Sequence, residues 1–76
     1  MTKEQTFIID TLLADLVRLI MEYQKVDCQS ALDILYNSRV YEQIMDIETG
    51  LYLQSADYNY ELYNNQQRNK LKLFSL

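Results

Sequence analysis

TKEQTFIIDTLLADLVRLIMEYQ, residues 2–24, is the stretch that decides the fold of this chain. Thr2 and Gln5 have the spacing of a capping box, in which the threonine hydroxyl accepts a hydrogen bond from the Gln5 backbone and the glutamine side chain accepts one from the Thr2 backbone. Apolar residues then recur at helical spacing as far as Gln24. The sequence therefore predicts a long helix that begins after Thr2 and ends near Gln24.

This predicted helix is apolar around most of its circumference. One narrow polar stripe holds Glu4, Thr11, Asp15, Arg18, Glu22 and Lys25. A surface helix usually has an apolar stripe a little over 100° wide, and this one is roughly twice as wide. We therefore expect the helix to be buried on two sides, with a second copy of the chain covering one of them. The expected assembly is a homodimer through the helix between Ile8 and Tyr23.

Two short helices are expected next, each with its own N-cap. Asp27 suits the start of the first, because its carboxylate would lie near the positive end of the helix. Ser38 follows a break at Asn37 and suits the start of the second. Each helix has one apolar face, made by Cys28, Ala31, Leu32, Leu35 and Tyr36 in the first and by Val40, Tyr41, Ile44 and Met45 in the second.

The single glycine, Gly50, is expected to cap the third helix or to turn the chain after it, because glycine takes a positive φ without cost. The four residues from Leu51 to Gln54 are interpreted as a short extended connection. Ser55 is expected to cap a last helix that begins near Ala56. One face of that helix carries Ala56, Tyr60, Tyr63, Gln67, Leu71 and Phe74, and Tyr58 and Leu62 lie nearly opposite.

Together these features predict an all-α fold, a small bundle of about four helices, with one long N-terminal helix, two short ones and a tyrosine-rich C-terminal one. Residues 1–76 are expected to form a single domain. Its last part, from about residue 66 to 76, is polar and basic and is expected to be a mobile tail or a docked extension.

Charge and composition limit the classes of partner. All eleven acidic residues lie between Glu4 and Glu61, and residues 1–61 contain four basic ones, so residues 1–61 have a formal charge of −7. Nucleic-acid binding depends on the opposite sign, and the three basic residues after Glu61 are too few to reverse it. We expect no membrane span, because charged residues interrupt every apolar segment. The lone cysteine and the lack of a signal-peptide pattern favour a cytoplasmic protein.

Residues for catalysis or metal binding are scarce. The chain has no histidine, which is the commonest acid–base and metal-binding group near neutral pH. Asp46 and Asp57 have the outer spacing of a calcium loop, but Gly50 falls at position 5 rather than 6 and apolar residues follow it. Cys28 lies on a core-directed helix face and is interpreted as a buried structural residue. We therefore predict no enzyme activity, no catalytic residue, no metal site and no cofactor.

Seven tyrosines in 76 residues are the main sign of a contact surface. Tyrosine combines an apolar ring with a hydroxyl that needs a partner, and it is enriched at interfaces. Tyr23, Tyr36 and Tyr41 continue apolar helix faces and are interpreted as core. A single small core cannot cover both sides of the last helix, so the partner-binding candidates are Tyr52, Tyr58, Tyr60, Tyr63, Leu71 and Phe74.

The ordered motifs ALDILYNS at residues 31–38, ETGLYLQS at 48–55 and YNYEL at 58–62 carry a family resemblance. Over residues 26–63 the chain resembles a group of short, uncharacterised bacterial helical proteins with a YNS…ETGLY…YxYEL pattern. Tyr63 departs from that pattern, which has an aliphatic residue there. Members of the group occur near genes for toxin-like enzymes, so the resemblance implies an antitoxin-like or accessory binding role. It supplies no catalytic or ligand residues.

The sequence thus favours a small non-enzymatic protein-binding module, antitoxin-like or accessory to a toxin-like partner. One alternative is a nucleic-acid-binding regulator of the helix-turn-helix type, with the break at Asn37 as its turn. That alternative needs a basic third helix, and only Arg39 is basic there. A second alternative is a purely structural homo-oligomer.

Overall fold

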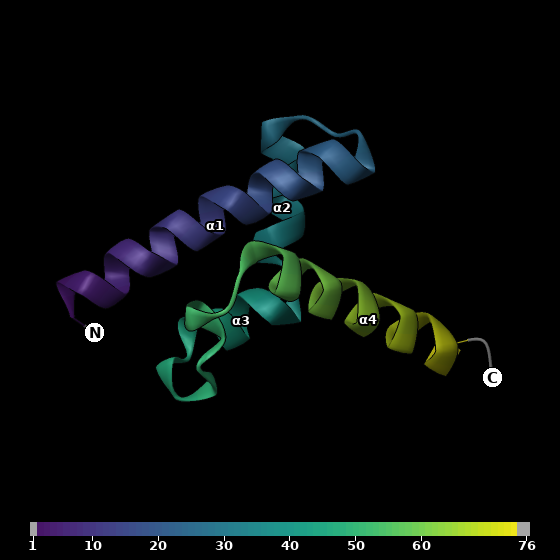
Figure 1. Ribbon diagram of the computed structural model, residues 1–76. Coiled ribbons are helices and arrows are strands. Elements are labelled where there is room, and N and C mark those ends of the chain that lie inside the picture. The colour runs from purple at the N-terminus through teal and green to yellow at the C-terminus, as the bar shows by residue number, and fades with distance from the viewer. Residues whose placement is uncertain (1, 75–76) are drawn as a thin grey trace.

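The all-α fold is confirmed by the computed structural model, which describes the backbone of residues 2–74 and the side chains of residues 2–68 (Figure 1). Within residues 2–74 it has four α-helices and no strand. The α-helices are α1 (Lys3–Gln24), α2 (Cys28–Tyr36), α3 (Arg39–Met45) and α4 (Ala56–Phe74). Two short 3₁₀ helices, η1 (Ile47–Thr49) and η2 (Leu51–Leu53), connect α3 to α4.

Each predicted N-cap is present, because each depends only on residues close together in the chain. Thr2 and Gln5 exchange both hydrogen bonds of the capping box at 2.9 and 3.0 Å. The Asp27 carboxylate, the Ser38 hydroxyl and the Ser55 hydroxyl accept from the backbone N–H three residues later, at 2.8, 3.2 and 3.1 Å. These bonds satisfy N–H groups that a helix start leaves without a partner.

The connection between α3 and α4 differs from the prediction. Helix α3 ends at Met45, and Gly50 ends η1 instead, with φ at 71°. The stretch after Gly50 is not extended but forms η2, where the N–H groups of Leu53 and Gln54 donate to carbonyls three residues back. The Thr49 hydroxyl donates to the Gln43 and Asp46 carbonyls, which ties the turn to the end of α3.

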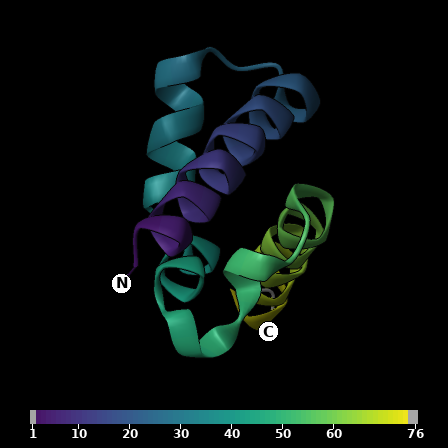
Figure 2. The same cartoon turned by 60° about the vertical axis from the view of Figure 1, so that its left-hand side comes forward.

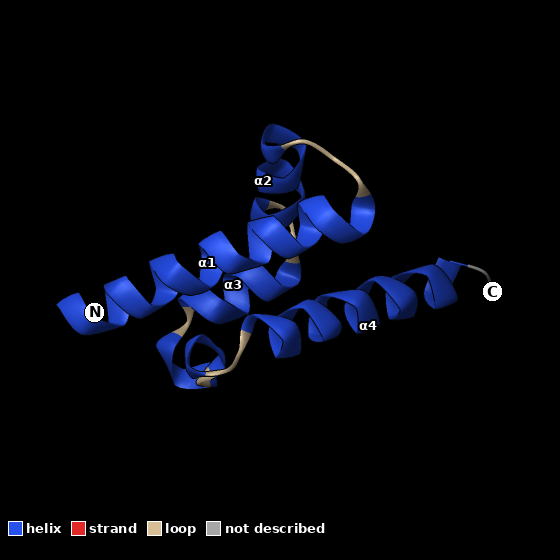
Figure 3. Cartoon of the chain, turned by 45° about the horizontal axis from the view of Figure 1, so that its top comes forward, coloured by secondary structure: helices blue, strands red, loops and turns tan. Residues whose placement is uncertain are grey.

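The core lies where α1 meets the other helices. Figure 2 shows α1 between α2 and α4, and α1 also contacts η2. Helix α3 contacts α2, α4 and η2. Figure 3 shows α4 continuing away from the rest of the molecule towards the C-terminus. The buried apolar residues are Ile9, Leu12, Leu16, Val17, Ile20, Ala31, Leu35, Val40, Ile44 and Tyr63.

The broad apolar arc of α1 is therefore covered from two sides within a single chain. Helix α2 packs on one side, and η2 and α4 pack on the other. We expected a second copy to cover that second side, and the chain itself does so. The homodimer through the helix between Ile8 and Tyr23 stays a prediction, but the width of the apolar arc of α1 no longer argues for it.

Three residues assigned to the core are exposed. Tyr23 is 62% exposed, and Tyr36 and Cys28 are exposed as well. All three lie in a terminal turn of a helix, where an apolar face extends past the elements that pack against it. Tyr41, from the same set of core tyrosines, is half-buried and packs edge-on against Tyr36, with ring centroids 5.1 Å apart.

Helix α4 continues to Phe74, through the segment from residue 66 that we expected to be a separate tail. The mobility of that segment stays a prediction. The side chains of Leu71 and Phe74 lie outside the described residues.

Candidate functional site

The structure separates the residues that were predicted to form one contact surface. Tyr63 is only 9% exposed and belongs to the core. Tyr58 is exposed on the outer face of α4. Tyr52 and Tyr60 are half-buried and line two different hollows. The predicted surface is therefore not one patch, and the two hollows are the places to look for binding.

The first hollow, which we call the α1–η2 groove, runs between the N-terminal half of α1 and the segment around η2. It has a volume of about 400 Å³. Leu12 is buried in it, whereas Phe7 is 72% and Leu53 65% exposed. Its residues are Phe7, Ile8, Thr11, Leu12, Asp15, Tyr52, Leu53, Gln54 and Ala56.

Two polar side chains fix the η2 wall of the groove. Gln5, the capping-box residue, donates from Nε2 to the Tyr52 hydroxyl at 3.2 Å. Asn59 is 0% exposed and donates from Nδ2 to the carbonyls of Leu51 and Ser55, at 3.1 and 3.0 Å. Each of these carbonyls also accepts a backbone hydrogen bond, from the N–H of Gln54 or of Asn59, so the Asn59 side chain adds a second bond to each, worth about 0.5–1.5 kcal/mol net. The wall is therefore held to both α1 and α4.

The second hollow, which we call the tyrosine–acid pocket, lies between the end of α1 and the first half of α4. It has a volume of about 420 Å³ and is lined by Tyr23, Asp57, Tyr60, Glu61 and Asn64. The Tyr23 and Tyr60 rings stack with centroids 5.2 Å apart and planes 20° apart. Tyr60 in turn stacks on Tyr63 at 5.9 Å. The stack connects the exposed end of α1 to the core.

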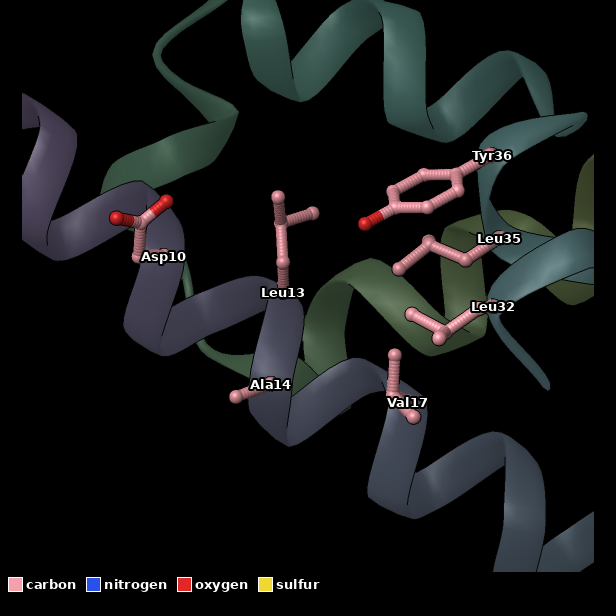
Figure 4. A pocket seen from close by; sticks show the side chains of 7 residues that line it. All are labelled: Asp10, Leu13, Ala14, Val17, Leu32, Leu35 and Tyr36. Atoms are coloured by element: carbon pink, nitrogen blue, oxygen red, sulfur yellow. The ribbon is translucent and has the colours of Figure 1, made fainter. Parts of the chain in front are cut away.

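A third hollow lies between α1 and α2 and holds about 220 Å³. Figure 4 shows the Tyr36 ring above it, with the hydroxyl directed towards α1, and Asp10 further along α1. The volume is below the roughly 300–1,000 Å³ of ordinary ligand pockets. The remaining lining residues are apolar: Leu13, Ala14, Val17, Leu32 and Leu35. This hollow offers few groups with which to orient a small molecule.

Two of the acidic residues singled out in the sequence, Asp27 and Asp46, act as helix caps. Within the described residues, no three His, Cys, Asp or Glu side chains are grouped so that they could hold a metal ion. The Asp46 carboxylate accepts from the Glu48 N–H at 3.1 Å and so caps η1. Hydrogen bonds from Ser30, first from its side chain and then from its backbone, lower the pKa of Asp27. This shift reflects a helix cap rather than a reactive group.

Sequence reasoning missed the most exposed residues of the groove, Phe7 and Leu53. Phe7 could have been found, because it lies on the polar stripe of α1 with Thr11 and Arg18, where an apolar residue has no core to face. Leu53 carried no such signal. Its position beside α1 depends on the fold of η2, more than forty residues later in the chain.

Comparison with known proteins found no matching family model, no similar curated protein and no similar solved structure. The resemblance to the bacterial group is therefore neither supported nor opposed. Within residues 2–74, none of the helices has the length and apolarity that crossing a membrane requires.

Proposed function

We propose that this chain is a small non-enzymatic protein-binding module and that the α1–η2 groove is its contact surface. The observation that carries the proposal is the exposure of Phe7, Ile8 and Leu53 around one hollow with a buried apolar floor. Fully burying a Phe, Ile or Leu side chain is worth about 1.5–3 kcal/mol. Three such residues at one groove give a partner several kcal/mol to gain.

The proposed partner is a toxin-like enzyme encoded near the chain's own gene, which makes the role antitoxin-like. This part of the proposal rests on the resemblance of residues 26–63 to the bacterial group. The groove has the type of surface that such a role needs, because a small module that inhibits an enzyme must bind it tightly. Tight interfaces are centred on apolar side chains that become buried on binding.

Co-expression with the product of a neighbouring toxin-like gene tests this function. We expect the chain to bind that protein and to relieve its effect on growth. The double variant Phe7→Gln, Leu53→Gln is expected to weaken binding at least about tenfold, since tenfold is only 1.4 kcal/mol. Glutamine keeps the side-chain length and the helix propensity at position 7.

Met45→Gln is the matched control, because Met45 is an exposed apolar residue outside the groove. It is expected to leave binding unchanged. If the double variant binds as tightly as the wild type, the groove is not the contact surface. If no neighbouring product binds at all, the antitoxin-like role is wrong.

Self-association is the competing use of the groove, and it corresponds to the purely structural alternative. Light scattering on the free protein decides between the two uses: a mass near the 9.1 kDa of one chain would leave the groove open to a separate partner and would contradict the predicted homodimer. A stable dimer that dissociates on Phe7→Gln and Leu53→Gln would instead assign the groove to a second copy.

A further inference from the structure

The tyrosine–acid pocket has a chemistry different from that of the groove. Its walls combine two stacked tyrosine rings with the carboxylates of Asp57 and Glu61 and the amide of Asn64. Asp57, Tyr60, Glu61 and Asn64 lie on one flank of α4, three or four residues apart, so their side chains are neighbours. Tyr23, from the last turns of α1, closes the pocket from the other side.

The two carboxylates of the pocket are not neutralised by the chain. Among the side chains of residues 2–68, the one ion pair joins Arg18 to Asp15 on α1. Arg68 is the nearest basic residue along α4 on the same flank, but it lies seven residues beyond Glu61, or about 10.5 Å of helix rise. Asp57 and Glu61 are both exposed and therefore available to a cation from outside.

The tyrosine rings favour the same kind of ligand. The face of an aromatic ring is negative, and a guanidinium or ammonium group within about 6 Å of the ring centre is attracted to it. Tyr23 is exposed over most of its surface, so its ring is accessible. A planar guanidinium can stack flat on such a ring and donate two parallel hydrogen bonds to a carboxylate at the same time, whereas an ammonium group has neither the plane nor the fork of donors.

We propose that the tyrosine–acid pocket binds an arginine side chain of the partner protein, with the guanidinium against Tyr23 and Tyr60 and hydrogen-bonded to Asp57 or Glu61. This inference rests on the proposed protein-binding function and gives that function a second contact. Complementary charge argues for this occupant, because residues 1–61 have a formal charge of −7 and attract a basic partner. The apolar groove then supplies affinity, and the pocket selects for a basic side chain beside it.

A titration of the full-length protein with a short, capped peptide containing two arginines tests the pocket directly. The comparison peptide carries citrulline, which has nearly the same shape without the charge. We expect the arginine peptide to shift the backbone amide signals of residues 22–25 and 57–64, and the citrulline peptide to leave them unchanged. Equal binding of the two peptides would overturn the proposal. A lysine peptide is expected to bind more weakly than the arginine peptide.

Variants of the pocket residues then test whether the arginine peptide binds in the tyrosine–acid pocket. Tyr23→Leu with Glu61→Gln removes one ring and one carboxylate, both from exposed positions, and is expected to weaken the arginine peptide about five- to tenfold. Glu48→Gln removes the same charge outside the pocket and is expected to have little effect. Equal losses in the pocket and control variants would show diffuse attraction to an acidic surface and would overturn the site. Glu61→Gln alone provides the same test if the double variant folds poorly.

Two further measurements distinguish binding at the pocket from binding at the groove and from self-association. Phe7→Gln with Leu53→Gln is expected to leave peptide binding intact, so the groove and the pocket can fail independently. Salt-sensitive self-association of the free protein that competes with the arginine peptide would assign the pocket to the basic C-terminal end of a second copy, which would overturn the assignment to a separate partner.

Discussion

The two halves of α1 are both rich in apolar residues, but the rest of the chain covers them to different extents. The C-terminal half holds Leu16, Val17 and Ile20, which are buried by α2 on one side and α4 on the other. The N-terminal half holds Phe7 and Ile8, which are exposed beside the short η2. Both halves also contribute to the core, the N-terminal half through Ile9 and Leu12, but the N-terminal half has a further apolar side that the rest of the chain leaves open.

The comparison of the two halves shows which apolar residues of α1 the rest of the chain leaves exposed. A chain of this size has little core to bury, and an exposed apolar patch in such a chain marks a place for a partner. In the packed half, apolar residues contribute to stability. In the open half, the exposed residues Phe7 and Ile8 contribute little to stability and are available for binding, whereas Ile9 and Leu12 belong to the core. Each prediction below tests this division of roles.

The largest expected effect is in the packed half. Leu16→Ala removes a side chain that is 1% exposed and leaves a cavity, so we expect the free energy of unfolding to fall by about 2–5 kcal/mol. Urea denaturation followed by circular dichroism measures it. Ile8→Ala in the open half is the matched control, with an expected loss below about 1 kcal/mol. Similar losses for the two variants would remove the distinction between the halves.

The next effect concerns the support of the open half. Asn59→Ala removes two hydrogen bonds from a buried side chain to the Leu51 and Ser55 carbonyls, each worth about 0.5–1.5 kcal/mol net, and is expected to cost about 1–3 kcal/mol in total. Asn65→Ala, on the exposed side of the same helix, is expected to stay within about 0.5 kcal/mol of the wild type. If Asn59→Ala is equally mild, the wall of the groove does not depend on this residue.

A smaller effect is expected at the hydrogen bond that spans the open half. Tyr52→Phe removes the partner of Gln5 Nε2, and because the site is only half-buried we expect a loss of about 0.5–1 kcal/mol. Tyr58→Phe removes an exposed hydroxyl elsewhere and is expected to change stability by less. Thermal unfolding of the two variants side by side makes the comparison, and a larger loss for Tyr58→Phe would contradict it.

Phe7→Gln is expected to leave stability within about 0.5 kcal/mol of the wild type, since the ring is mostly exposed. Paired with the loss of partner binding proposed above, this result would separate the binding role from the folding role. A loss of more than about 2 kcal/mol, measured by urea denaturation, would mean that Phe7 belongs to the core.

The smallest effect lies outside both halves, at the cap of α2. Hydrogen bonds from Ser30 lower the pKa of Asp27 below its unfolded value of about 3.9. The ionised cap therefore adds stability above that value, and this stability is lost as the pH falls through the lower folded pKa. Asp27→Asn keeps a capping oxygen without the charge, so its unfolding free energy should vary less between about pH 2 and 4. An unchanged pH profile would contradict this.

The helices and their starts could be predicted because the deciding residues are close together in the sequence. Thr2, Asp27, Ser38 and Ser55 each act on a backbone group a few residues away. The turn after α3 was harder, because Gly50 indicated where the chain bends but not that 3₁₀ helices lie on both sides of it.

The candidate site depended on contacts that helical spacing does not contain. A helical wheel assigns Tyr23 and Tyr36 to apolar faces but does not say where along the helix the neighbouring element ends. It also cannot show that Tyr63 is buried while Tyr60, three residues earlier, lines a pocket. The groove itself joins residues 7–15 to residues 52–56, and only the folded chain brings these together.

Gln5 has two roles, and together they couple the start of α1 to the groove. Its side-chain oxygen accepts from the Thr2 N–H, and its side-chain nitrogen donates to Tyr52. Fraying of the first turn of α1 breaks this hydrogen bond and loosens η2, so we expect the two segments to open together. Hydrogen exchange would then give the first turn of α1 and η2 a shared opening rate, and a ligand seated in the groove would slow exchange at both.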